Sequence, residues 1–194
     1  MAGLWRNVGE DLKAKARWCY ERDDWRARCK VLLTDGTPAM ILYRLMQWSR
    51  SCGLFPLEML CNKLNAICCN CIIGRGAEFG PGFVLVHATG VVINGNVRGG
   101  CNVFVEHQVT IGAERRQSPR LGSDVFIGAG AKIIGAVTLG DGARVGANAV
   151  VVRDVPPHAT VVGIPARVVR QRTPDGAVAA SVAVPVDRQH ALEH

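Results

Sequence analysis

The stretch that decides the fold runs from Leu121 to Pro156 and reads LGSDVFIGAGAKIIGAVTLGDGARVGANAVVVRDVP. Each of six successive hexads opens on an apolar residue, namely Leu121, Ile127, Ile133, Leu139, Val145 and Val151. The fifth position of each hexad is also apolar, at Val125, Ala131, Val137, Ala143, Ala149 and Val155. Neither an α-helix nor an ordinary strand has a period of six. This period predicts a left-handed parallel β-helix, in which three hexads form one triangular coil.

The same frame extends toward the N-terminus with two interruptions. It takes in Ile73, Phe79 and Leu85, and then Ile93, Gly99, Val105 and Ile111. The frame slips by two residues around 88–90, and it breaks again at 113–120, where the charged and polar residues cannot be buried in a coil. We interpret the second break as an external loop, because solenoid corners tolerate insertions.

The chain divides into three parts. Residues 1–71 carry apolar residues at helical spacing, and we expect a helical segment that packs on the solenoid end or on another subunit, with a membrane surface as the less favoured alternative. Residues 72–170 form the predicted β-helix. Residues 171–194 have no period and are expected to be a mobile tail, whose final Leu-Glu-His resembles a tag remnant.

Composition limits the partners. The 194 residues carry a net charge of +7 and no 18-residue apolar run, which predicts a cytoplasmic protein with no membrane span. Basic and aromatic residues are not interleaved as in base-stacking proteins, so no nucleic-acid partner is expected. The eight cysteines are expected to be reduced. Cys68-x-x-Cys71 is half of a zinc motif, and we interpret it as small buried residues without a metal.

Two histidines are the strongest candidates for chemistry. His87 and His107 are each the third residue of a hexad, and counting hexads returns both to the same corner, one coil apart. Their rings are therefore expected about 5 Å apart along the axis. A neutral imidazole can accept a proton from a hydroxyl. Since the chain has no Gly-x-Ser-x-Gly nucleophile motif, direct transfer to the acceptor is favoured over a covalent intermediate.

Several motifs resemble one family of acyltransferases. They are His-Ala-Thr-Gly-Val-Val-Ile-Asn at 87–94, Val-Thr-Ile-Gly at 109–112, Ile-Gly-Ala-Gly-Ala-Lys-Ile-Ile-Gly at 127–135, Val-Gly-Ala-Asn-Ala-Val-Val at 145–151 and Val-Gly-Ile-Pro-Ala-Arg-Val at 162–168. Over residues 72–170 the chain resembles the serine acetyltransferase branch of the hexapeptide-repeat acyltransferases. This resemblance implies acetyl transfer from acetyl-CoA to a hydroxyl, and homotrimers or dimers of trimers with sites between neighbouring solenoids.

The resemblance also implies roles for particular residues. His87 would be the catalytic base, and His107 with Glu106 would bind the acceptor. The backbone of Gly112, Ala113, Ala129 and Ala147 would face the pantetheine arm of CoA, with Arg167 near its phosphates. The lining would be small because the cofactor lies in a groove between coils.

The departures from the family pattern fall on the acceptor side. Ile72 stands where the family has the aspartate that orients the base, and Val86 stands where it has an aspartate for the ammonium group of serine. Gln117-Ser118 replaces an Arg-His pair that would meet the serine carboxylate. Arg-Asp-Asp-Trp at 22–25 aligns loosely with another acceptor aspartate, but a helix cap is the favoured interpretation.

Glu106-His107, followed by Gln-Val-Thr-Ile-Gly at 108–112, also resembles related enzymes that acetylate sugars during exopolysaccharide assembly, such as colanic acid O-acetyltransferases. We therefore expect a sugar or exopolysaccharide precursor as the acceptor, with serine as the alternative. The orienting partner of His87 is left open between a backbone carbonyl and Glu106. Two other classes remain: a non-catalytic trimeric scaffold, and a zinc enzyme with histidines from adjacent subunits, similar to carbonic anhydrase.

Overall fold

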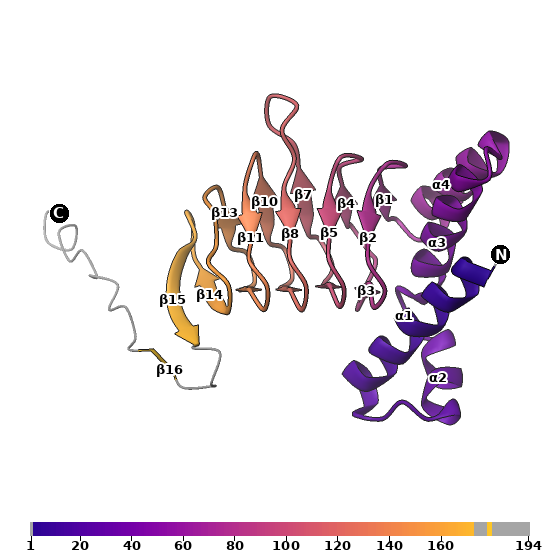
Figure 1. Cartoon of the computed structure of the whole chain (residues 1–194), viewed down its shortest axis with the longest axis horizontal. Helices are drawn as coiled ribbons and strands as arrows, with labels where there is room; N and C mark the ends of the chain where they lie inside the picture. The colour runs from indigo at the N-terminus through magenta and orange to yellow at the C-terminus, as the bar shows by residue number, and fades with distance from the viewer. Residues whose placement is uncertain (1, 173–177, 180–194) are drawn as a thin grey trace, which may run out of the picture.

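The computed structural model describes residues 2–172 and 178–179. Four helices gather at one end, and a solenoid of short strands extends from them (Figure 1). The helices are α1 (Ala2–Tyr20), α2 (Trp25–Leu32), α3 (Thr37–Ser51) and α4 (Phe55–Cys68). No helix among the described residues is long and apolar enough to cross a bilayer.

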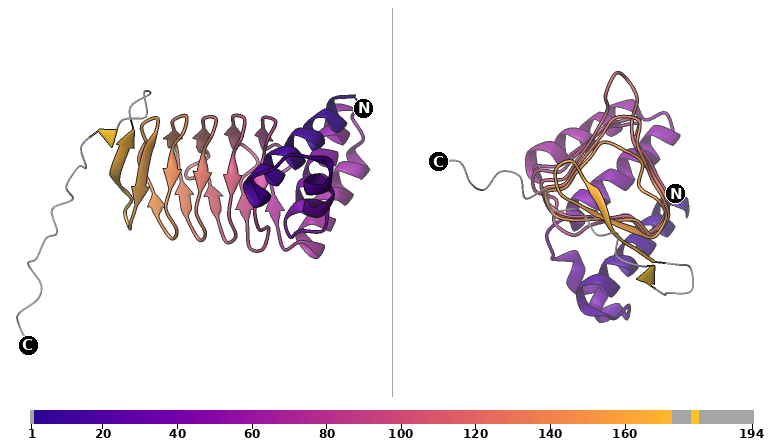
Figure 2. Two further views of the ribbon diagram at one scale, coloured as in Figure 1. Left: turned by 90° about the horizontal axis from the view of Figure 1, so that it is seen from below. Right: turned by 90° about the vertical axis from the view of Figure 1, so that its left-hand side faces the viewer.

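The solenoid has three parallel sheets, which form a roughly triangular outline when viewed along the axis (Figure 2). Sheet A contains β1 (Ile72–Ile73), β4 (Val92–Ile93), β7 (Thr110–Gly112), β10 (Lys132–Ile134) and β13 (Val150–Val151). Sheet B contains β2 (Glu78–Phe79), β5 (Arg98–Gly99), β8 (Arg120–Leu121) and β11 (Thr138–Leu139). Sheet C contains β3 (Val84–Leu85), β6 (Phe104–Val105), β9 (Phe126–Ile127), β12 (Arg144–Val145) and β14 (Ala159–Val162).

The six-residue period defines the core. Every hexad-opening residue and every fifth-position residue between Leu121 and Val155 is at most 6% exposed. Equivalent residues stack on one another in register, as Ile111 does beneath Ile133. This architecture is the left-handed parallel β-helix typical of hexapeptide repeats, which confirms the predicted fold.

Both predicted interruptions occur at corners. Ile72 pairs with Val92, 20 residues later, whereas Val92 pairs with Thr110 after 18. The extra two residues lie in the corner between β3 and β4. The loop between β7 and β8 projects beyond the neighbouring coils (Figure 1). An added residue at a corner leaves the buried positions in phase, so the core continues across both interruptions.

The helical segment covers the first coil. Tyr43 of α3 packs edge-on against the rings of Phe79 and Phe83, and its hydroxyl accepts a hydrogen bond from the Phe79 amide at 3.1 Å. The ring of Trp18 on α1 stacks over Phe104 and Phe126 of sheet C. A solenoid needs such a cap because its terminal coil otherwise exposes the core.

The other end differs from a regular coil. Strand β15 (Arg167–Arg172) pairs antiparallel with β14 and continues two residues past the expected boundary at 170. Strand β16 (Val178–Ala179) pairs with β15. The rest of the expected tail, at 173–177 and 180–194, lies outside the described residues.

The cysteines differ partly from the prediction. All eight are free thiols, and Cys71 is buried, where burial raises its pKa to about 12. Cys68 is exposed, so its interpretation as a buried residue is wrong. It occupies the last position of α4, which ends at the surface.

Candidate active site

The candidate base stands on an enlarged corner of the solenoid. His87 lies in the connection between β3 and β4, where Ala88 and Val91 point into the core. The chain turns at Gly90, whose φ of +74° lies in the region that glycine adopts most readily. With its neighbours anchored inside, the His87 side chain projects outward and is 53% exposed.

The structure brings the two predicted histidines together. The ring centroids of His87 and His107 are 5.9 Å apart, with an interplanar angle of 74°. The hexad count predicted this stacking. Glu106, however, lies 3.7 Å from Nδ1 of His107. The carboxylate that contacts His87 comes instead from the helical segment, and the sequence did not predict it as the partner of the base.

Asp35 supplies the partner of His87. Its Oδ2 lies 3.2 Å from Nδ1 of His87. An ionised carboxylate only accepts hydrogen bonds, so Nδ1 must carry the proton. The lone pair of the neutral ring is then on Nε2, where it can accept a proton from a substrate. Among the described residues, neither option left open by the sequence, Glu106 or a backbone carbonyl, bonds to this ring nitrogen.

The loop between α2 and α3 fixes the Asp35 carboxylate. The amide of Gly36 donates to Oδ1 of Asp35 at 2.8 Å, which leaves Oδ2 facing His87. Gly36 has a φ of +83°, and a Cβ there would lie 2.4 Å from the carbonyl oxygen of Leu85. The loop therefore sits against the strand that leads to His87. Ile72, in the position of the family aspartate, is 52% exposed on β1.

Two predicted cofactor residues continue the same edge. Ala129 and Ala147 occupy the corners after β9 and β12, above His107. The Gly130 amide donates to the His107 carbonyl at 2.9 Å, and the Asn148 amide donates to the Ala129 carbonyl at 2.8 Å. These hydrogen bonds hold the successive corners above one another. Because both residues are alanines, no bulky side chain projects from either position.

The other predicted cofactor residues lie at two different places on the protomer. Gly112 ends β7, and Ala113 follows it at the next corner of the triangle. Arg167 is exposed at the start of β15. Arg167 pairs with Val162, which lies one coil beyond Gly146, so it stands at the C-terminal end of the edge that carries His87 and Ala147. Within one protomer Gly112 and Ala113 do not join this edge. The assignment of all three residues to CoA stays a prediction.

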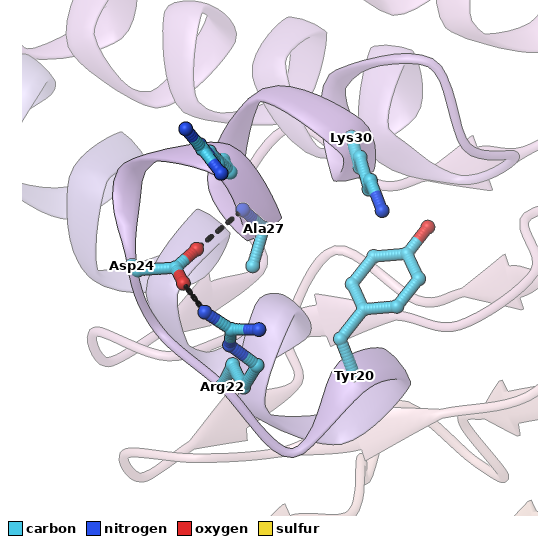
Figure 3. A pocket seen from close by; sticks show the side chains of 6 residues that line it. Tyr20, Arg22, Asp24, Ala27 and Lys30 are labelled. Carbon is cyan, nitrogen blue, oxygen red and sulfur yellow. Dashed lines mark hydrogen bonds and ion pairs between the residues drawn. The ribbon is translucent and has the colours of Figure 1, made fainter.

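A separate hollow of about 320 Å³ lies at the α1–α2 connection (Figure 3). Tyr20, Arg22 and Lys30 line it together with Asp24. Asp24 caps α2 by accepting from the Ala27 amide at 2.8 Å, and this hydrogen bond lowers the pKa of Asp24. Asp24 also pairs with Arg22. The helix-cap interpretation of this acidic pair is therefore correct for Asp24.

Within residues 2–172 and 178–179, no three side chains of histidine, cysteine, aspartate or glutamate lie where they could hold one metal ion together. The chemistry that this site offers is that of an oriented imidazole beside small-residue corners.

Comparison with known proteins identifies the family. Residues 118–153 match the model of the bacterial transferase hexapeptide (six repeats). The chain is 38% identical to the serine acetyltransferase of Mycobacterium tuberculosis over 148 residues, covering 74% of this chain and 65% of that protein. It is 34% identical to the serine acetyltransferase of Helicobacter pylori strain J99 over 170 residues, covering 86% of this chain and 94% of that protein.

Solved structures agree with this result. The serine acetyltransferase of Neisseria gonorrhoeae superposes with a TM-score of 0.81 at 31% identity, covering 90% of this chain and 70% of that one. A serine acetyltransferase in complex with CoA gives a TM-score of 0.78 at 28% identity, covering 87% of this chain and 70% of that one. The chain therefore belongs to the serine acetyltransferase family of hexapeptide-repeat acyltransferases.

Proposed function

We propose that this protein is an acetyl-CoA-dependent O-acetyltransferase whose general base is His87 and whose acceptor is the hydroxyl of serine. The observation that carries the proposal is the 3.2 Å contact between Asp35 and Nδ1 of His87, which leaves the lone pair of the neutral ring on Nε2. A base oriented by a carboxylate is the arrangement that activates a hydroxyl nucleophile.

The reaction needs no covalent enzyme intermediate. Nε2 of His87 takes the proton of the acceptor hydroxyl as its oxygen attacks the thioester carbonyl of acetyl-CoA. The tetrahedral intermediate collapses with loss of the CoA thiolate, which receives that proton from Nε2. Asp35 stabilises the transient imidazolium, because its carboxylate accepts from Nδ1 throughout. Backbone amides along the corners at Ala129 and Ala147 are the candidates to stabilise the oxyanion.

Two findings favour serine over the sugar acceptor expected from the sequence. The relatives described above are named serine acetyltransferases. The expectation of a sugar rested on missing acceptor-side residues, such as the aspartate replaced by Val86, and on the resemblance of Glu106-His107 to exopolysaccharide O-acetyltransferases. Asp35 and Glu106 now supply carboxylates at the two histidines, so the ammonium group of an amino acid has acidic partners there.

A sugar hydroxyl remains the second candidate because of one feature of the corner. Val86, which directly precedes the base, is apolar and half-buried. An apolar side chain at this point cannot form an ion pair with the ammonium group of serine, whereas the apolar face of a sugar ring can pack against it.

We also propose that the chain assembles as a homotrimer with its sites between protomers. Support comes from the paired residues Ile72 and Val92, whose apolar side chains are exposed on the outer face of sheet A. A neighbouring solenoid would cover them and would bring a second set of corners toward His87. Size-exclusion chromatography with light scattering measures the molar mass of the assembly. We expect a trimer for the wild type and monomers for Val92→Lys.

The deciding experiment measures CoA thiol release from acetyl-CoA with L-serine and, separately, with a panel of sugars. We expect release with serine and a loss of about 10²- to 10⁴-fold in kcat for His87→Asn. His158→Asn is the matched control, since His158 lies at another corner and has the positive φ that asparagine tolerates. Release with sugars alone would replace serine by the second candidate. Turnover by His87→Asn close to that of the wild type would remove His87 as the base.

A further inference from the structure

A buried lysine lies directly behind the Asp35–His87 contact. Lys15 of α1 is fully buried, and its Nζ donates to the carbonyl oxygen of Leu85 at 2.9 Å and to that of Asp35. One ammonium group thus bridges the helical segment and the solenoid strand that leads into the corner of His87. Burial of such a group is costly, and this cost is offset only where its hydrogen bonds are made.

The two carbonyls belong to the two sides of the contact. Leu85 is two residues before His87, and Asp35 is the residue whose side-chain carboxylate contacts the His87 ring. Gly36 completes the arrangement, because a Cβ there would lie 3.1 Å from Nζ of Lys15 and 2.4 Å from the Leu85 oxygen. The close approach of loop and strand therefore depends on the lysine between them and on the absence of a side chain at 36.

We propose that Lys15 is a positioning residue for the acetyl transfer, holding the Asp35 loop against β3 so that the Asp35 carboxylate fixes the proton of His87 on Nδ1. The inference rests on the proposed function for its catalytic meaning. It assigns to the helical segment the task that an aspartate at position 72 would perform from within the solenoid. Lys15 itself does not touch His87 in this arrangement.

Other charged groups face this cluster and belong in any test. Burial lowers the pKa of Lys15 to about 8, and Cys19, one turn along α1, is the other titratable group beside it on that helix. Burial raises the pKa of Cys19, and Glu106, which directly follows β6, raises it further. On the solvent side, the ring of His107 faces His87. Measurements with reductant and at one fixed pH make the state of these groups comparable between the variants.

The direct readout is the tautomer of the His87 ring, obtained from the ¹⁵N chemical shifts of the two ring nitrogens at a pH where the ring is neutral. A His87→Asn sample assigns the signals. We expect the wild type to hold the proton on Nδ1. In Lys15→Met, which keeps the chain length but removes the donors, the population should move toward the Nε2–H form, as it should in Asp35→Ala.

The double variant Lys15→Met/Asp35→Ala separates positioning from a general loss of structure. If Lys15 acts through Asp35, the double variant has the tautomer population and the kcat of Asp35→Ala alone. A double variant clearly worse than Asp35→Ala would overturn the proposal. Lys13→Met is the matched control on the same helix, since Lys13 is partly exposed and, among the residues that the structure describes, pairs only with Glu10 at 3.8 Å; it should match the wild type.

The second test measures the acetyl-transfer kinetics of the same variants. CoA release by Lys15→Met should fall about 10- to 100-fold in kcat, with the KM for acetyl-CoA within about twofold of the wild type, because the lysine touches neither substrate. If the wild type released no CoA with any acceptor, the proposed function would fail, while the tautomer would still report whether Lys15 orders the contact. A folded Lys15→Met protein with the wild-type tautomer would overturn the inference.

If Lys15→Met does not fold, Gly36→Ala tests the same relationship with the lysine retained. Its added methyl group would push the loop away from the Leu85 carbonyl. The expected result is again a shift toward the Nε2–H form, and an unchanged tautomer in this variant would overturn the proposal.

Discussion

The guanidinium of Arg44 and the carboxylate of Asp11 form a bidentate ion pair in the interior, with distances of 2.7 and 2.9 Å. Both side chains are almost fully buried. Asp11 also accepts from the amides of Gly82 and Phe83, and Arg44 donates to the carbonyls of Phe79 and Gly80. The pair therefore joins α1 and α3 to the first coil. It also provides hydrogen-bond partners for backbone groups of that coil, which the helices bury.

Breaking this pair should destabilise the fold strongly. Asp11→Asn leaves the buried guanidinium without its counter-charge, and we expect a loss of about 3 to 5 kcal/mol in the free energy of unfolding, measured in urea. Asp23→Asn, which disrupts the exposed pair with Arg17, is the control and should leave the urea midpoint unchanged. A midpoint for Asp11→Asn equal to that of the control would mean that the ion pair does not hold the helical segment to the solenoid.

Trp18 should contribute to the same attachment through packing. Its ring lies 5.0 Å from that of Phe104 and 5.2 Å from that of Phe126, and it remains 39% exposed. Trp18→Ala removes these contacts, and we expect a loss of about 2 to 3 kcal/mol in the free energy of unfolding, less than for a fully buried tryptophan. Trp25→Ala is the matched control, because Trp25 is 70% exposed on the neighbouring helix. Equal losses for the two variants would contradict the role of the Trp18 stack.

The solenoid could be predicted from sequence because its contacts repeat. Once the period of six is read, the inward position of Ile127 and the stacking of His107 above His87 follow from counting. The slip of two residues before Ile93 was also visible, since it interrupts the count. Insertions at corners change the length of a coil without changing which residues face inward. The buried positions after each insertion could therefore still be predicted.

The partner of His87 could not be predicted in this way. Asp35 lies 52 positions earlier in the chain, in a loop between helices that have no repeat, and its place depends on how the whole helical segment docks. The contacts that decide this docking, such as those of Lys15 and Arg44, are made by charged residues that sequence patterns assign to the surface. One signal was present: Thr-Asp-Gly-Thr-Pro at 34–38 marks a tight turn, although it does not say what the turn faces.

The proposed CoA-binding edge can be tested at Ala147. Ala147 is exposed at the corner above Ala129, and a large side chain there would occupy the space assigned to the pantetheine arm. We expect Ala147→Trp to weaken CoA binding at least about tenfold in titration calorimetry, with an unchanged melting temperature. Thr138→Trp, on the exposed face of sheet B, is the control. If both variants bound CoA like the wild type, the groove would have to lie along another edge.

The buried ammonium of Lys15 predicts how stability depends on pH. Burial lowers its pKa in the folded protein to about 8, from an ordinary value of 10.5. Between these two values the unfolded chain binds more protons than the folded one, so the free energy of unfolding attributable to Lys15 rises with pH. Relative to Lys15→Met, the wild type should gain up to about 3 kcal/mol between pH 7.5 and pH 10.5. Urea denaturation of both proteins across this range, with reductant present, measures the difference. A difference that stayed constant or fell with pH would show that the lysine is not held in its charged form at a cost, and that its two carbonyl contacts are made without desolvating the ammonium.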